Sequence, residues 1–402
     1  MASSRAIGFS PVPTFIIQRE PDKYGGQQDD YVKQVESIVE TCAQRFRTAV
    51  DNNEDLITLF HETLSFMANH RHRIAVEHGT KKHKHFGKPR NAEDVHKTFL
   101  STPAIGQYQD YGVRINAHIC TLLKQMRDKN GVFQDSKRCF PGTPIAGRQS
   151  SLEVEILKHD EKAKWSLAYT LEEFQRICAL SNLVPPADSS QIEATLEKLI
   201  RNPDALRLLK EKSIEDYKRV KISTITRIIR HFTNEAYGVE HEQHLKGKKI
   251  DWVVVTLRVQ IGDKMVALTQ QITWMHLDCD PNEDPVDHIQ SCAHVTLLHQ
   301  DYFLIELMRK DIAEIFKRIL TTDSKDQKQV MMQTGLFEYE FAHAMLFLRG
   351  PSAIGEWFEV ALYKFHGHKL KYNPHMLVNL AALSHRLDVF LETYPKTLRL
   401  YT

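Results

Sequence analysis

Residues 250–276, IDWVVVTLRVQIGDKMVALTQQITWMH, decide the class of fold that we expect for this chain. β-branched and aromatic residues fill Trp252–Val255, and apolar residues then continue at alternate positions. Gly262 and Asp263 form a turn pair, and 265–274 returns with a similar composition. Two apolar, β-prone runs around a two-residue turn predict a β-hairpin.

A second hairpin is predicted upstream, where two short segments alternate between apolar and polar residues. In 152–156, Leu, Val and Ile are separated by Glu, and in 165–169, Trp, Leu and Tyr occupy alternate positions. The polar run HDEKAK at 159–164 separates them. Alternation with period two is typical of half-buried strands.

Most other apolar residues recur at spacings of three and four, which is typical of amphipathic helices. Gly (17) and Pro (15) are scarce, which also favours helices. We expect helices at about 30–50, 53–73, 107–128, 170–182, 287–320, 327–349, 352–366 and 375–394, two or three more within 189–235, and one that begins at Asn91. The predicted fold is mainly α (α+β), with helical N- and C-terminal lobes and two small β-hairpins in the middle third.

Changes in composition predict four regions. Residues 1–29 form an extended, proline-interrupted N-terminal arm, and 30–150 form an N-terminal helical lobe. Residues 151–285 form a mixed α/β middle region, and 286–402 form a C-terminal helical lobe. The arm carries apolar residues that a purely disordered tail does not need. It packs either on its own body or on a neighbouring copy, and in the second case the protein is a homo-oligomer.

The composition is that of a soluble globular protein, with 42% hydrophobic and 26% charged residues and a net charge of +2. Six cysteines are scattered without a CxxC pair, which predicts a reducing, cytoplasmic compartment. The N-terminus lacks the apolar core of a signal peptide, and no apolar run approaches the roughly 18 residues that a membrane span needs.

The most unusual stretch is HRHRIAVEHGTKKHKHFGKPRNAEDVHK, residues 70–97, with eight Lys or Arg, six His and three acids. Such a density of positive charge predicts a site for polyanions, above all RNA phosphate. We expect phosphate contacts from Lys81, Lys82, Lys84, Lys88 and Arg90, with Tyr108 available to stack on a base. The alternative is a solvated loop that binds nothing in particular.

Arg71 and Arg73 precede His78 at one predicted helix end. An Arg followed by a His four to six residues later resembles the active-site pattern of the HEPN ribonucleases. In that family, the two side chains sit on one helix and cleave RNA without metal. The resemblance implies metal-independent catalysis by Arg71, Arg73 and His78. The alternative is a basic helix C-terminus that complements the helix dipole.

An acidic loop follows the 250–276 hairpin, and its sequence HLDCDPNEDPVDH begins at His276. His276-x-Asp278 has the spacing of two ligands in a 2-His-1-carboxylate site, and His288 is a third candidate ligand. A divalent metal is therefore a possible cofactor. The alternative is a solvated turn before the next helix.

No phosphate-binding glycine loop, nucleophile elbow or phosphatase motif occurs in the sequence. Glu338 and Glu340, in a predicted helix, are interpreted as solvent-facing acids. We therefore expect a non-enzymatic RNA-binding protein, such as an RNA-packaging or coat protein. The alternatives are an enzyme, as the metal-independent ribonuclease or at the acidic loop with a metal, and a protein-binding module.

Overall fold

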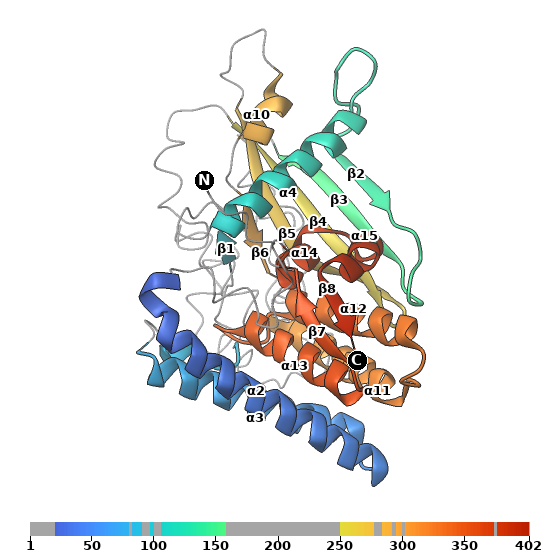
Figure 1. Ribbon diagram of the computed structural model, residues 1–402. Helices are drawn as coiled ribbons and strands as arrows, with labels where there is room; N and C mark the ends of the chain where they lie inside the picture. The colour runs from blue at the N-terminus through green and yellow to red at the C-terminus, as the bar shows by residue number, and fades with distance from the viewer. Residues whose placement is uncertain are drawn as a thin grey trace, which may run out of the picture.

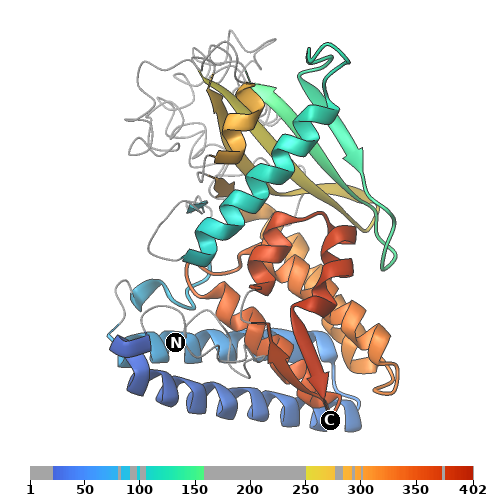
Figure 2. The ribbon, with the colours of Figure 1, turned by 45° about the horizontal axis from the view of Figure 1, so that its top comes forward.

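The protein is described here by a computed structural model, which defines an α+β architecture. It describes residues 21–79, 83–90, 97–99, 106–157, 250–276, 284–291, 295–299, 302–373 and 376–401. Within these ranges, a sheet with helices across one face lies at one end, and long helices form the other end (Figures 1 and 2).

The described sheet has six strands in the order β1-β6-β5-β4-β3-β2, and every neighbouring pair is antiparallel. Its strands are β1 (Lys97–Phe99), β2 (Lys137–Pro141), β3 (Ser150–Leu157), β4 (Ile250–Ile261), β5 (Lys264–His276) and β6 (Thr296–Leu298). A separate two-stranded sheet pairs β7 (Lys369–Tyr372) with β8 (Leu398–Tyr401).

The predicted hairpin at 250–276 is confirmed as β4 and β5, the two longest described strands. Gly262 turns the chain with φ of 62°, a left-handed conformation that glycine adopts without steric cost. The register places Trp252 opposite Trp274, and their rings meet edge to face with centroids 5.7 Å apart. Such a cross-strand aromatic pair stabilises a sheet by roughly 0.2–1 kcal/mol.

The alternating sequence of β4 gives the sheet two different faces. Val253, Val255 and Leu257 are fully buried and belong to the main hydrophobic core shared with the helices. Val254 points to the other face, where it forms a small cluster with Ile272. Helix α4 (Gly106–Gln125) crosses the sheet in Figure 1, and its buried residues join the main core.

The helical end consists mainly of α2, α3 and α11–α13, which lie side by side in Figures 1 and 2. The remaining described helices are short apart from α4. The bounds are α2 Pro21–Asp51, α3 Leu56–Glu77, η1 His83–His85, α10 Pro285–Ser291, α11 Tyr302–Thr321, α12 Gln327–Ala344, α13 Pro351–Phe365, α14 Val378–Ser384, α15 Leu387–Thr393 and η4 Tyr394–Lys396.

N-terminal and C-terminal helices share one aromatic core. Phe46 of α2 and Phe60 of α3 both contact Phe316 of α11, with ring centroids 5.1 and 5.6 Å apart. Phe60 also lies 5.6 Å from Phe358 of α13. Each such ring buries roughly 150–250 Å², so these contacts hold α2 and α3 firmly against the C-terminal helices. The predicted N- and C-terminal lobes thus meet in a single core.

Several sequence predictions differ from the structure near the N-terminus and around β3. α2 begins at Pro21, so residues 21–29 of the predicted extended arm are helical, and residues 1–20 lie outside the described residues. β3 pairs with β2 on one side and β4 on the other, so both of its edges are occupied. Its predicted partner, 165–169, lies outside the described residues, as do the helices predicted within 158–249.

Short strands also interrupt regions that were predicted to be helical. β6 lies inside the predicted helix 287–320, because Thr296–Leu298 adds to the edge of β5. β7 and β8 lie in the predicted C-terminal helical lobe. The predicted helix 375–394 is two helices, because His385 and Arg386 between them have extended backbone. Strands of three or four residues are too short for their periodicity to register.

Candidate anion-binding surface

Helix α3 carries the basic stretch, and its amphipathic pattern decides which cations face inward. Asp55 caps its start by accepting from the N–H groups of Ile57 and Thr58. The buried face runs through Met67 to Arg71, one turn later, so Arg71 is only 8% exposed. Its neighbours His72 and Arg73 are exposed.

Residues 83–90 lie against the connection between α12 and α13. The N–H of Gly87 donates to Arg349 O at 3.1 Å, and the N–H of Leu348 donates to Lys88 O at 2.9 Å. Gly87 has φ of 68°, and a Cβ there would be 2.1 Å from Ala68 O of α3. Glycine at this position therefore lets the segment pack directly on the α3 backbone.

The Phe86 ring contacts two arginines where the segment 83–90 meets the connection between α12 and α13. The Arg71 guanidinium lies 4.3 Å from the centroid of the Phe86 ring, and that of Arg349 lies 5.9 Å from it. These are cation–π distances. Lys84 and Lys88 on the same segment are exposed, as is Arg349. Two arginines that contact one ring and two exposed lysines therefore lie on this segment and the connection it packs against.

These four cations have no carboxylate partner among the described residues. The ion pairs found among the described residues involve other arginines and lysines. Distances of 2.5 to 3.1 Å join Arg45 to Glu54, Lys124 to Asp287, Arg127 to Asp284, Lys137 to Glu153, Arg148 to Asp311, Arg258 to Glu153, Lys364 to Glu40 and Arg386 to Asp388. In the described part of the chain, no acid pairs with Arg71, Lys84, Lys88 or Arg349. We define these four residues as the cationic junction.

The predicted nucleic-acid contacts are placed as follows. Lys84 and Lys88 are exposed, while Lys81 and Lys82 lie outside the described residues. Arg90 is 4% exposed and donates to Met345 O at 3.4 Å, so the structure turns it inward, contrary to the prediction. The reason is that 86–90 pairs with 346–349 instead of forming a solvated loop. Tyr108 lies in α4, and its side chain is outside the description.

The three predicted ribonuclease residues do not share one face of α3. Arg71 points inward and Arg73 outward, because two residues turn a helix by about 200°. Arg73 contacts the His70 ring at 2.7 Å. His78 is the C-cap of α3, and its N–H donates to Ile74 O. Arg73 is therefore separated from the other two.

The predicted metal ligands can be located only in part. His276 ends β5 and His288 lies in α10, with both side chains outside the described residues, as is all of Asp278. Within the described ranges, no three His, Cys, Asp or Glu side chains are arranged to hold a metal ion. The metal site remains a prediction.

Buried acids between α12 and α13 were not predicted. Glu338 and Glu340 are 3% and 0% exposed, so their interpretation as solvent-facing acids is wrong. Glu356 and Glu359 of α13 are also buried. Glu359 accepts hydrogen bonds from the hydroxyls of two tyrosines, Tyr372 at 2.5 Å and Tyr394. Burial raises the pKa of Glu356 to about 8 and that of Glu359 to about 7.

One of these acids belongs to a buried ion network. Arg148, 8% exposed, lies 2.6 Å from Asp311 of α11 and 3.1 Å from Glu340 of α12. It also donates to Gln260 O at 2.9 Å. Burial raises the pKa of Glu340 well above its usual range, and Arg148 opposes this shift. This network joins the sheet to two helices.

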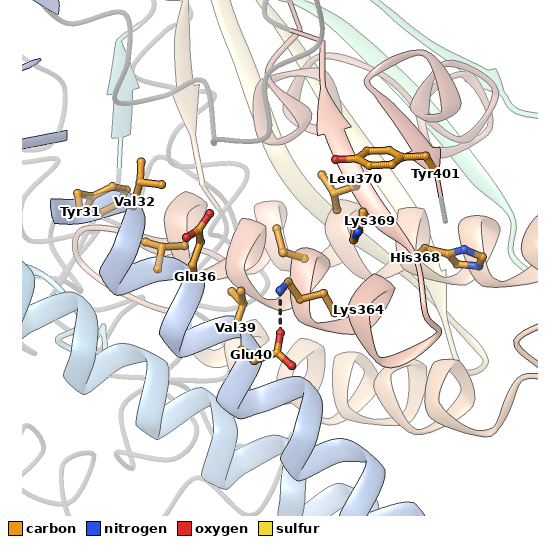
Figure 3. A pocket seen from close by; sticks show the side chains of 12 residues that line it. Tyr31, Val32, Glu36, Val39, Glu40, Lys364, His368, Lys369, Leu370 and Tyr401 are labelled. Atoms are coloured by element: carbon orange, nitrogen blue, oxygen red, sulfur yellow. Dashed lines mark hydrogen bonds and ion pairs between the residues drawn. The ribbon is translucent and has the colours of Figure 1, made fainter. Parts of the chain in front are cut away.

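A pocket of about 410 Å³ lies between α2, α13 and the β7–β8 hairpin (Figure 3). Valines of α2 and α13 line it, and Tyr31 and Tyr401 are also part of its wall. Lys364 donates to Glu40 at 2.8 Å within it. This cation is paired, whereas His368 and the exposed Lys369, which also line the pocket, form no ion pair among the described residues.

Comparison with known proteins does not indicate a function, so the function has to be inferred from the residues of this chain. No model of a known protein family matches the sequence, and no curated protein matches it significantly. Among the described helices, none is both long and apolar enough to cross a bilayer.

Sequence reasoning missed Arg349, a member of the cationic junction, and Phe86, the ring that Arg71 and Arg349 contact. A signal for Arg349 was present, because Arg349-Gly-Pro351 is a cation directly before a proline-initiated helix. Phe86 is an isolated apolar residue in a polar run. Nothing local indicates that these two residues meet, since they are over 260 positions apart in the chain.

Proposed function

We propose that this protein binds the phosphate backbone of single-stranded RNA without catalysis, as an RNA-packaging protein does. The observation that carries the proposal is the cationic junction, where cations without carboxylate partners stand on an ordered segment. Cations that already neutralise acids gain little from a phosphate, whereas unpaired ones release counterions when they bind it.

The fixed backbone of the junction supports the proposal further. Residues 86–90 are held by hydrogen bonds to 346–349, so Lys84 and Lys88 project from an ordered base. Ordering before binding lowers the entropy that binding costs. Lys81 and Lys82 belong to the same stretch of sequence and would extend the contact along the RNA.

A salt titration of single-stranded RNA binding tests the proposal. Contacts from Lys81, Lys82, Lys84, Lys88 and Arg349 give a slope of about −3.5 in log K against log salt, at about −0.7 per contact. Replacing the four lysines by Glu should reduce the slope to about −0.7 and abolish most binding. Binding should depend little on base sequence, because phosphate contacts position without specifying.

The matched control replaces four other exposed lysines by Glu: Lys33, Lys310, Lys325 and Lys328. It has the same net charge change, so it should keep the slope if the site is local. Thermal stability should change little in both variants, because surface charges contribute little to folding. An absence of RNA binding by the parent at about 50 mM salt would refute the proposal, as would equal slopes in both variants.

A further inference from the structure

We propose that the N-terminus of α13, together with Arg71, forms a discrete site for a single phosphate group. The site lies beside Lys84 and Lys88 but uses different atoms: the Arg71 guanidinium, the N–H groups of Ser352 and Ala353, and the Ser352 hydroxyl. Where the phosphate belongs to an RNA chain, the inference rests on the proposed function. For free phosphate it stands independently.

Arg71 is the first line of evidence. It is 8% exposed, and its buried Nε has no hydrogen-bond partner among the described residues. Its guanidinium stacks on Phe86 and pairs with no described carboxylate. A buried cation without an anion is costly unless a ligand supplies the charge. Arginine remains charged even when buried, so the cost is not relieved by loss of a proton.

The start of α13 is the second line of evidence. Its N-cap is Gly350, which has no side chain to cap the helix, and Pro351 follows. The first helical bond joins the N–H of Ile354 to Gly350 O at 3.2 Å. The N–H groups of Ser352 and Ala353 come before it, so they have no acceptor within the helix. These donors, with the helix dipole, favour an anion.

The two features meet at Gly350. A Cβ on Gly350 would lie 2.9 Å from Arg71 Cγ and 3.2 Å from its Nε. Arg71 therefore runs directly past the uncapped helix end. Gly350 and Ser352 are half-buried and Arg349 is exposed, so the helix end reaches solvent.

The available donors match a tetrahedral oxyanion. Ser352 Oγ accepts from Asn379 Nδ2 at 2.8 Å, which leaves its own hydrogen to donate. Together with two backbone N–H groups and the planar guanidinium, this makes several donors and no described acceptor carboxylate. Arg and helix N-termini both suit phosphate, which accepts several hydrogen bonds at once.

The experiment titrates the full chain with inorganic phosphate and follows the midpoint of thermal unfolding. Sodium chloride at matched ionic strength is the reference. A saturable rise beyond the chloride response is expected, because a ligand that binds only the folded state stabilises it. An equal response to phosphate and chloride would overturn the inference.

Three variants locate the site. Arg71→Met should weaken phosphate binding roughly ten- to hundredfold, the range for one charge-assisted hydrogen bond. Arg71→Lys keeps the charge but lacks the planar guanidinium, so its affinity for phosphate should lie between those of the parent and Arg71→Met. It also serves as the test if Arg71→Met fails to fold. Ser352→Ala should weaken binding by a smaller factor. Arg73→Met, an equal charge change on the exposed side of α3, should bind as the parent does.

Two further arms identify the source of the phosphate and separate the two proposals. In the parent, a 5′-phosphorylated oligonucleotide should bind more tightly than its 5′-hydroxyl form if the site takes a terminal phosphate, and equally if it takes a diester. The four-lysine variant should keep phosphate binding while losing RNA. RNA binding without phosphate binding refutes this inference alone, and phosphate binding without RNA binding refutes the proposed function alone. Undiminished phosphate binding in Arg71→Met also refutes this inference.

Discussion

Arg71 and Arg148 are both 8% exposed, yet their surroundings differ. Arg148 lies 2.6 Å from Asp311 and 3.1 Å from Glu340, and it also donates to a main-chain carbonyl. The Arg71 guanidinium stacks on the Phe86 ring and interacts electrostatically with Tyr31, but it pairs with no described carboxylate. The Arg148 guanidinium already binds carboxylates of the protein itself, whereas the Arg71 guanidinium remains able to bind an added anion.

The same contrast extends along α13. Cations gather at its N-terminus, while Glu356 and Glu359 are buried further along it with no described cation paired to them. Around Arg148, opposite charges meet within one network. Opposite charges that pair with each other stabilise the fold. Unpaired cations can instead bind an anion, and unpaired buried acids make the stability of the protein depend on pH.

Arg148→Met should have the largest effect on stability. Removing one partner of a buried ion pair typically costs about 3–5 kcal/mol, because the other charge stays buried and unpaired. Urea unfolding of the parent and the variant measures the difference. A loss below about 1 kcal/mol would show that Arg148 contributes as little to stability as Arg71 is expected to, which would contradict the contrast drawn between the two arginines.

The buried acids of α13 should make stability fall as pH rises from 6.5 to 8. The pKa of Glu356 is about 8 in the folded protein, against an ordinary value of 4.5. In this window the folded protein therefore holds a proton that the unfolded chain has released, and higher pH favours unfolding. One such group contributes up to about 1.4 kcal/mol per pH unit.

Comparing the parent with Glu356→Gln isolates this effect. The variant has no titrating group at this position, so its stability should fall less steeply between pH 6.5 and 8. The window begins at 6.5 because buried His343 and His366, with pKa lowered to about 3 and about 4, act in the opposite direction below it. Parallel pH curves for the two proteins would contradict the prediction.

Arg71→Met should have the smallest effect on stability. The substitution loses a cation–π contact of roughly 0.5–2 kcal/mol but also removes a buried charge without a partner. The free energy of unfolding in phosphate-free buffer should therefore change by no more than about 1 kcal/mol. A loss as large as that of Arg148→Met would place Arg71 among the structural arginines.

The parts of the fold that the sequence predicted are those with long, regular patterns. The hairpin at 250–276 has two strands of at least twelve residues around Gly262, and the helices α4 and α13 begin and end close to their predicted bounds. α12 begins at its predicted residue but ends at Ala344, five residues before the predicted end. Short strands such as β6 could not be predicted, because three residues carry no measurable periodicity.

For the candidate site, the sequence located a stretch rich in positive charge, but it did not show how that stretch packs against the rest of the chain. Density of Lys and Arg pointed to the stretch at 70–97, and Lys84 and Lys88 are indeed exposed. The burial of Arg71 and Arg90 depends on contacts with 345–350, which lie far along the chain. Glu338 and Glu340 were misassigned because α12 is buried on almost every side, so no polar face exists to receive them.

The packing of α2 and α3 on the C-terminal helices has a consequence for synthesis on the ribosome. Arg47 donates to Lys364 O, 317 positions later in the chain. At about 5–20 residues per second, the partner of Arg47 emerges roughly 15–60 s after it. During that interval Phe46 and Phe60 lack the aromatic rings of α11 and α13 that cover them in the finished protein. Until α13 is made, the nascent N-terminal helices therefore lack the partners that cover their aromatic side chains, and such transiently exposed apolar surface promotes aggregation.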